Sequence, residues 1–264
     1  MSERPLQGKV LVIIGGTTGL GLSAARAFVQ AGAKVVAVGR SPRSVKAAQA
    51  KLGKSAQVLA GDATNSATAA RAIRAALRRF GGFHGLYHVA GGSGRTEGDG
   101  PLHEITDAGW SFTLNLNLTS LFNSNRAASR QFLEQKTGGS VLNLSSVLGF
   151  SPAPKFFSTH AYAAAKAAII GLTRSAAAYY AAHNIRFNVL APALVATPMS
   201  ERAQDDPRIL AYVAAKQPLD GGRIGQPADL DAAAVYFMSD HSKFVTGQVL
   251  AVDGGWCVSE GKYG

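Results

Sequence analysis

A tyrosine and a lysine stand four residues apart in the segment YAAAK, residues 162–166. The segment lies in an alanine-rich stretch that predicts a helix over 161–182, so the Tyr162 phenol and the Lys166 ammonium share one helix face. A free phenol has a pKa near ~10 and exchanges protons poorly at neutral pH, whereas a neighbouring positive charge favours the phenolate. The pair therefore suits general acid–base catalysis, although the same spacing also occurs as an interfacial tyrosine and a solvated lysine.

Small polar side chains accompany the pair. Ser145 and Ser146 follow the apolar run of a strand predicted over 140–145, and Asn117 lies in a helix predicted over 110–133. Ligands of an open parallel sheet bind outside the carboxyl ends of its strands. We therefore expect Ser146 to face the same crevice as Tyr162.

A glycine-rich loop, GGTTGLG at residues 15–21, joins a predicted strand over 9–14 to a predicted helix over 20–31. Bare backbone can approach a pyrophosphate there, and the helix N-terminus favours negative charge. Because a strand precedes the loop and a helix follows it, the pattern predicts nucleotide binding, with an ordinary tight turn as the alternative. The loop residues assigned to the nucleotide are Gly15, Thr17, Thr18, Gly19, Leu20 and Gly21.

The end of the second predicted strand, over 34–38, bears on which nucleotide binds. A bound NAD favours a carboxylate roughly 20 residues past the glycines, but the chain has no acidic residue between Arg4 and Gly61. Arg40, with Ser41 beside it, offers a guanidinium fork to a 2′-phosphate. NADP(H) is favoured and NAD(H) is not excluded, since an exposed arginine beside a loop is the alternative.

The remaining pattern alternates strands with helices. Further strands are predicted over 56–60, 86–90, 185–190 and 249–252, and further helices over 42–52, 66–80 and 228–238. Nearly continuous apolar strands indicate a parallel sheet covered on both faces. The predicted fold class is α/β, a doubly wound parallel sheet (Rossmann fold) in one domain over 1–264, with a substrate lid at about 197–223.

Charge is concentrated in the first third of the chain. Of 27 basic and 16 acidic residues, the first 80 positions hold 13 basic and 2 acidic ones. A basic surface attracts anions, which leaves a non-catalytic NADP(H)-binding regulator, associated with an anion or nucleic acid, as the alternative to an enzyme. Nucleic acid is disfavoured because Phe28 is the one aromatic residue among the first 79.

Other features limit the class of protein. The lone Cys257 has no partner for a disulfide, and the first apolar run is too short for a signal-peptide core. The stretch 161–182 carries two basic residues, so no membrane span is expected. The prediction is a soluble cytoplasmic protein. No metal is expected, because His84 and His88 lie on a predicted strand, where core packing is their ordinary role.

Taken in order, these motifs resemble the short-chain dehydrogenase/reductase family in its single-domain form, over about residues 8–255. The landmarks that carry the resemblance are Gly15, Gly19, Gly21, Asp62, Ala90, Gly91, Asn117, Ser146, Tyr162, Lys166, Pro192, Thr197, Pro198 and residues 252–255.

The resemblance implies a hydride transfer between a nicotinamide nucleotide and a small carbonyl or secondary alcohol. Tyr162 would be the general acid/base, Lys166 would lower its pKa and bind the nicotinamide ribose, Ser146 would hold the substrate oxygen, and Asn117 would support a proton-relaying water. The resemblance also implies a homotetramer, or a dimer, formed through 110–134, 160–182 and the C-terminal region.

The remaining cofactor contacts are implied in the same way. The adenine would meet Asp62 and Ala63, the adenosine side would meet Ala90 and Gly91, and the nicotinamide end would meet Pro192, Val195 and Thr197.

Some positions depart from the family pattern. Ile14 stands where a threonine is usual, His88 where an asparagine is usual, and Ala193 where a glycine is usual. The Ser146–Tyr162 interval is also longer than usual, which keeps Ser145, Ser151 and Ser158 as rival donors to the substrate oxygen.

Side chains around the expected crevice bear on the substrate. Phe156, Phe157 and His160 are candidates for lining the substrate pocket. Arg95 and Arg202 are candidates for binding an anionic substrate group, with ordinary surface arginines as the alternative.

Overall fold

The computed structural model describes residues 4–261, and in that range the strands form one seven-stranded sheet in which every neighbouring pair is parallel. Its order is β3-β2-β1-β4-β5-β6-β7. The strands are β1 (Val10–Ile14), β2 (Lys34–Gly39), β3 (Ala56–Ala60), β4 (Gly85–His88), β5 (Gly139–Leu144), β6 (Ile185–Pro192) and β7 (Val249–Val252). The predicted doubly wound fold is confirmed. The two ends of the predicted domain, residues 1–3 and 262–264, lie outside the described residues. Residues 1–3 also begin the N-terminal segment in which no signal peptide is expected.

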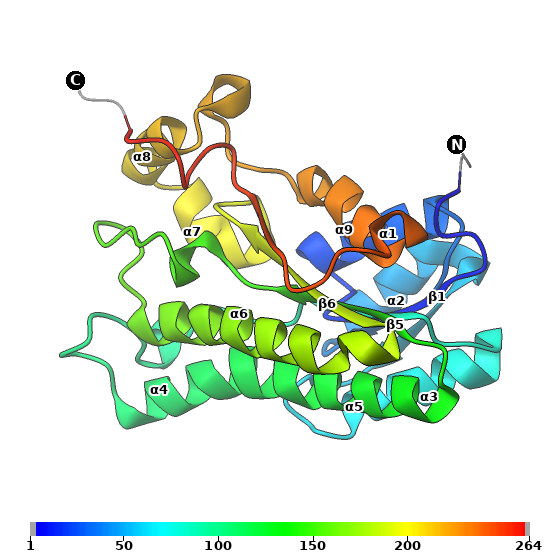
Figure 1. Cartoon of the computed structure of the whole chain (residues 1–264). Helices are drawn as coiled ribbons and strands as arrows, with labels where there is room; N and C mark the ends of the chain where they lie inside the picture. Colours follow the sequence, from blue (N-terminus) through cyan, green and yellow to red (C-terminus); the bar gives the residue numbers. More distant parts are fainter. Residues whose placement is uncertain (1–3, 262–264) are drawn as a thin grey trace.

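Helices cover both faces of the sheet, with α1 and α9 on one face and α5 and α6 on the other (Figure 1). The α-helices are α1 (Gly19–Gln30), α2 (Pro42–Leu52), α3 (Thr68–Phe80), α4 (Asp107–Leu114), α5 (Ser120–Gln135), α6 (His160–Tyr180), α7 (Glu201–Gln204), α8 (Pro207–Lys216) and α9 (Asp231–Met238). Among the described residues, none of the helices combines the length and the apolar character needed to cross a membrane.

Strand β1 shows why the strands read as unbroken apolar runs. Leu11 and Ile13 belong to the core that contains Phe28 of α1, whereas Val12 belongs to the core that contains Phe132 of α5. Successive side chains of a strand point to opposite faces. Strand β1 therefore carries apolar residues at every position, because both of its faces are buried.

The helix predicted over 110–133 is not continuous. Helix α4 ends at Leu114, a π-helical turn η3 spans Asn115–Thr119, and α5 begins at Ser120. A π turn inserts an extra residue into a helix and often occurs at functional sites. The helix predicted over 228–238 is also shorter, because a 3-10 turn, Pro227–Leu230, precedes α9.

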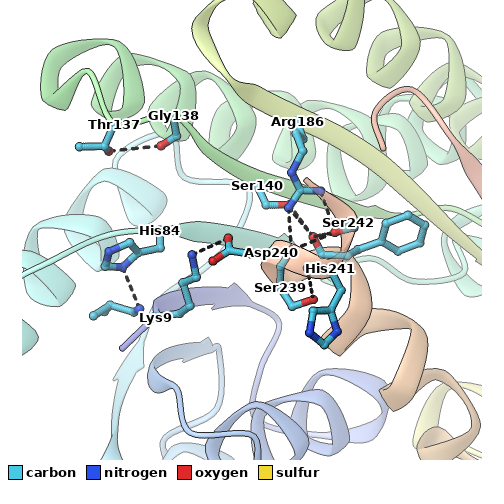
Figure 2. A network of polar contacts seen from close by, with 12 residues as sticks. Lys9, His84, Thr137, Gly138, Ser140, Arg186, Ser239, Asp240, His241 and Ser242 are labelled. Carbon is cyan, nitrogen blue, oxygen red and sulfur yellow. Dashed lines mark hydrogen bonds and ion pairs between the residues drawn. The ribbon is translucent and has the colours of Figure 1, made fainter. Parts of the chain in front are cut away.

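The amino ends of the central strands are joined by a polar network (Figure 2). Arg186 of β6 donates hydrogen bonds to the Ser242 hydroxyl and the Phe237 carbonyl, both at 2.9 Å. Ser140 of β5 donates to the same Phe237 carbonyl at 2.8 Å. At this edge of the sheet the protein's own polar groups satisfy one another.

Candidate active site

A cavity of about 570 Å³ opens at the carboxyl ends of the strands. Strands β1 and β4 are neighbours in the sheet although they are not consecutive in the chain, and the chain leaves them in opposite directions. This arrangement is the switch point at which doubly wound folds bind ligands. The residues assigned from the sequence to catalysis or to the cofactor that line the cavity are Leu20, Arg40, Gly91, Ser146, Tyr162, Lys166, Pro192, Val195 and Thr197. The substrate candidates that line it are Arg95, Ser145, Phe157 and Arg202, whereas Phe156 and His160 lie outside the lining.

The glycine loop packs backbone against backbone. Gly15 has φ +90°, and a Cβ on it would lie 2.6 Å from the Ala90 nitrogen. A Cβ on Gly21 would collide with the Gly15 carbonyl oxygen. Any side chain at these positions would therefore push the loop away from the sheet.

Helix α1 begins directly after this loop. Its N-cap residue, Thr18, makes no side-chain capping bond, and its first turn contains no acidic residue. The first backbone N–H groups of α1 thus face no capping group of the helix itself, which fits an anionic phosphate. Gly19 lies near Thr197, since a Cβ there would lie 3.4 Å from the Thr197 methyl carbon.

Of the residues next to the start of α1 and the end of β2, Arg40 lines the cavity, whereas Ser41 and Thr17 do not. Arg40 lines the cavity and is exposed, while Ser41 is the N-cap residue of α2 and lies outside the lining. Thr17 is buried and shares a 3.1 Å hydrogen bond with Ser44. Thr17 therefore supports the loop from the side of β2, where it packs over Gly39.

Asp62 lies beyond the end of β3, outside the cavity lining, as does Ala63. The Asp62 carboxylate accepts hydrogen bonds from the Thr64 amide and hydroxyl, both at 2.8 Å. These bonds lower the pKa of Asp62, and the positive charge of Arg40 acts in the same direction.

Tyr162 and Lys166 meet Ser146 at one wall of the cavity. The Lys166 ammonium lies 5.3 Å from the centre of the Tyr162 ring and donates to the Leu144 carbonyl at 3.1 Å. Burial raises the pKa of Tyr162 to about 12, and a hydrogen bond with Ser146 opposes that rise. Burial also lowers the pKa of Lys166 to about 8. Before any ligand binds, burial thus works against the phenolate, more strongly than the sequence suggested.

The candidate serines differ in what they contact. Ser146 lines the cavity, accepts from the Leu148 amide at 3.2 Å and lies 3.4 Å from the Pro192 carbonyl. Ser145 also lines the cavity, but its hydroxyl donates to the Lys166 carbonyl at 2.7 Å. Ser151 and Ser158 lie outside the lining.

Asn117 is fully buried in the π turn η3. Its amide donates to the carbonyls of Gly92 and Thr113 at 2.9 Å each, and its oxygen accepts from the Gly92 amide at 3.1 Å. A Cβ on Gly91 would lie 2.7 Å from the Asn117 oxygen and 3.4 Å from the Lys166 ammonium. Asn117 thereby fixes the loop after β4 beside the lysine.

His88, the last residue of β4, stands where an asparagine is usual in the family pattern and makes polar contacts with both its ring nitrogens. Its ring nitrogens lie 2.7 Å from the Ser124 hydroxyl and 3.0 Å from the Ala90 carbonyl oxygen. Burial, together with the charge of Lys166, lowers the pKa of His88 to about 3. The ring is therefore neutral at physiological pH, and it ties β4 to α5.

Asp99 is a site residue that the sequence did not reveal. Its buried carboxylate accepts from the Ala161 amide at 3.0 Å and from the Tyr162 amide at 2.9 Å, and the Gly100 carbonyl accepts from His160 at 3.1 Å. The loop after β4 thus caps the helix that carries the tyrosine. The cap residue lies 62 positions before its partner, so local sequence gives no signal for it.

The chain matches a protein-family model described as enoyl-(acyl carrier protein) reductase over residues 15–257. This chain belongs to the short-chain dehydrogenase/reductase family. A short-chain dehydrogenase/reductase structure from Mycobacterium ulcerans superposes with a TM-score of 0.88 at 31% identity, covering 97% of this chain and 92% of that one.

Two curated relatives of this short-chain dehydrogenase/reductase come from Xanthobacter autotrophicus. This chain is 39% identical to the inactive 2-(S)-hydroxypropyl-CoM dehydrogenase 2, over 88% of this chain and 98% of that protein. It is 35% identical to 2-(S)-hydroxypropyl-CoM dehydrogenase 3, over 97% and 98%. The chain is accordingly an oxidoreductase that acts on CH–OH groups of small molecules with a nicotinamide nucleotide.

Proposed function

We propose that this enzyme interconverts a secondary alcohol and its ketone with NADP(H), using Tyr162 as the general acid/base. The observation that carries the proposal is the meeting of the Tyr162 phenol, the Ser146 hydroxyl and the Lys166 ammonium at one cavity wall. The 2-hydroxypropyl group in the relatives' names is itself a secondary alcohol. When bound, the nicotinamide ring supplies or accepts the hydride.

The chain's own groups handle the proton and the substrate oxygen. In reduction, Tyr162 gives its proton to the carbonyl oxygen, and in oxidation it takes the proton from the alcohol. Ser146 donates a hydrogen bond to the same oxygen and orients it. Lys166 stabilises the phenolate, and Asn117 holds the adjoining loop so that protons reach the lysine.

The preference for a 2′-phosphate is supported by charge at the end of β2. Arg40 is exposed, lines the cavity and makes no ion pair among residues 4–261. A guanidinium fork binds phosphate oxygens in two places at once. Ser41 adds a hydroxyl next to it, and no carboxylate stands at the strand end to bind a free ribose.

In the same proposal, the glycine-rich loop binds the pyrophosphate through Gly15, Thr18, Gly19, Leu20 and Gly21. The nicotinamide half would meet Pro192, Val195 and Thr197. The adenosine half would be supported by Thr17, Asp62, Ala63, Ala90 and Gly91.

The segment 197–223 is proposed to close over the substrate. Ala203 of α7 and Val213 of α8 pack with Trp256 and Val147, while Met199 lines the cavity and is 57% exposed. A segment that rests on the cavity mouth through few buried side chains can move as a unit and exclude water when it closes.

A homotetramer, or a dimer, is proposed from the outer faces of α4, α5 and α6. Trp110, Phe112 and Phe122 are each more than 40% exposed there. On α6, Ala161 and Ala165 are buried inside the chain, whereas Ala164 and Ala168 are exposed on its outer surface. A monomeric mass in light scattering at micromolar concentration would overturn this proposal.

The proposed activity is tested by assaying a panel of ketones with NADPH and with NADH. We expect NADPH oxidation that depends on ketone, and a lower KM for NADPH than for NADH. Nucleotide binding without turnover of any ketone or secondary alcohol would overturn the catalytic part of the proposal. A lower KM for NADH would overturn the cofactor preference alone.

A further inference from the structure

Two arginines from separate segments line the same cavity as Tyr162. Arg95 begins the 3-10 turn η2 (Arg95–Glu97) in the loop after β4, and Arg202 lies in α7. Both are far along the chain from Arg40, which serves the nucleotide in the proposed function. The cavity therefore carries two further cationic groups with no assigned task.

Both arginines are exposed, and neither is held in an ion pair within residues 4–261. Over the same range, the Arg95 guanidinium makes no hydrogen bond. Arg202 donates only to the Phe156 carbonyl, at 3.4 Å. In contrast, Arg208 pairs with Asp206 at 3.0 Å, so arginines of the same region do find partners where the protein supplies them.

The two guanidinium groups also disfavour each other. Partial burial lowers the pKa of Arg95, the nearby charge of Arg202 lowers it further, and the Asp99 carboxylate opposes both effects. A cation that is partly removed from water beside another cation is costly until an anion joins them. A negatively charged ligand that binds both guanidinium groups removes this repulsion, so the arrangement favours its binding.

The nearby carboxylates form no ion pair with either arginine among the described residues. The Asp99 carboxylate acts on Arg95 through its charge, but its oxygens accept from the backbone of α6. Glu97 lines the cavity, and its carboxylate accepts from the Thr96 hydroxyl at 3.4 Å.

Most of the cavity lining is apolar and includes Leu148, Phe157 and Trp256. A ligand that fits this lining and meets both arginines has an apolar body with a charged end. We propose that Arg95 and Arg202 bind an anionic oxyacid group, such as a carboxylate, at the end of the substrate remote from its reacting carbonyl. This inference rests on the proposed function and names the substrate class: ketones or secondary alcohols with an anionic tail.

The test compares straight-chain methyl ketones that end in a carboxylate with their uncharged methyl esters. Binding to the protein saturated with NADP+ is measured by calorimetry, and reduction with NADPH is measured separately. The variants are Arg95→Gln, Arg202→Gln and the double substitution. Lys155→Gln is the matched control, because Lys155 is an exposed cation that stacks on Phe156 at 5.5 Å but does not line the cavity.

We expect the wild type to bind the best keto acid at least 10-fold more tightly than its ester. Each arginine variant should lose about 10-fold in affinity for the acid and the double variant more, with changes below about 3-fold for the ester and in Lys155→Gln. In turnover the loss should appear in KM rather than in kcat.

The outcomes separate the two proposals. Arginine-dependent binding of the acid without turnover supports the anion site and contradicts the proposed activity. Equal turnover of acid and ester, unchanged in the arginine variants, supports the activity and overturns the anion site. Failure of every keto acid to bind, or equal losses for acid and ester in the arginine variants, also overturns the anion site.

Discussion

The arginines at the two edges of the sheet differ in their hydrogen-bond partners. The amino edge is the side on which the amino ends of the strands lie, and the carboxyl edge is the side of the cavity. At the amino edge, Arg186 is half-buried and donates to hydroxyl and carbonyl oxygens of the segment 237–245, as Figure 2 shows in part. Lys9, close by, pairs with Asp240 at 2.7 Å. At the carboxyl edge, Arg95 lines a cavity and makes no such contacts within residues 4–261. Burial lowers the pKa of both arginines, and the two differ in exposure as well as in partners, since Arg95 is exposed and Arg186 is half-buried.

The presence or absence of protein partners separates side chains that stabilise the fold from side chains that can bind a ligand. A satisfied buried donor stabilises the native state, and its removal leaves acceptors without partners. An exposed donor without a protein partner stays hydrated, contributes little to stability and can bind a ligand. We therefore expect substitutions at the amino edge to lower stability and substitutions at the carboxyl edge to change binding or rate.

The largest effect is expected for Tyr162→Phe, at the carboxyl edge. Loss of the phenolic proton should reduce kcat by roughly 10²- to 10⁴-fold, the range for a general acid/base. The midpoint of thermal unfolding and the affinity for NADPH should change little. Tyr179→Phe is the control, because Tyr179 lies on the same helix and is 73% exposed. A Tyr162→Phe enzyme with near-normal kcat would assign the proton to another group.

The second-largest effect is expected in the stability of variants at Arg186, on the amino edge, compared with variants at Arg95, on the carboxyl edge. Arg186→Ala should lower the free energy of unfolding by about 2–4 kcal/mol, because several buried acceptors lose their donor. Arg95→Gln should change it by less than about 0.5 kcal/mol. Urea denaturation of both variants measures the contrast. Equal losses of stability would remove the distinction between the edges.

Two histidines extend the comparison to pH. The folded protein keeps His88 neutral, with a pKa of about 3, whereas the unfolded chain binds that proton near pH ~6.5. The unfolded state therefore binds more protons between these values, and stability falls as the pH falls from about 6.5 toward 3. The share due to His88 should be about 2 kcal/mol between pH 7 and pH 5.

Urea titrations at several pH values measure this dependence in the wild type and in His88→Asn, where it should be flatter. His84→Asn is the comparison at the amino edge. Burial lowers the pKa of His84, which is only partly buried and accepts a hydrogen bond from the Val10 amide. A His88→Asn profile parallel to that of the wild type would contradict the assignment.

The smallest effect is expected at Asp99. Asp99→Ala removes the cap of α6 and should cost about 1–2 kcal/mol of stability. It should also lower kcat by about 10-fold with little change in KM, because the tyrosine backbone loses its anchor. Asp99→Asn keeps an acceptor oxygen and should recover part of both losses. A stability loss without a change in kcat would make Asp99 a structural cap only.

The sequence predicted much of the fold because each strand carries its own signal. Continuous apolar runs and the glycine loop depend on neighbours in the chain, so β1, the loop and α1 were placed within one or two residues. The π turn at Asn117 and the Asp99 cap were missed, since both depend on contacts between distant segments.

The candidate site shows the same limit. Residue types indicated Tyr162, Lys166 and Ser146, and the structure brings these three together at one cavity wall. Sequence could not indicate that the Thr17 side chain packs against Gly39 or that the Ser145 hydroxyl donates to the backbone of α6. Those facts follow from side-chain direction, which spacing along the chain does not fix.

The most direct test of the proposed NADP(H) site is a calorimetric titration of NADPH and of NADH into the wild type and the Arg40→Ala variant. We expect the wild type to bind NADPH at least 10-fold more tightly than NADH, a difference of about 1.4 kcal/mol or more. We expect Arg40→Ala to remove this difference. Failure of both nucleotides to bind the wild type would contradict the assignment of the carboxyl edge as a nicotinamide nucleotide site.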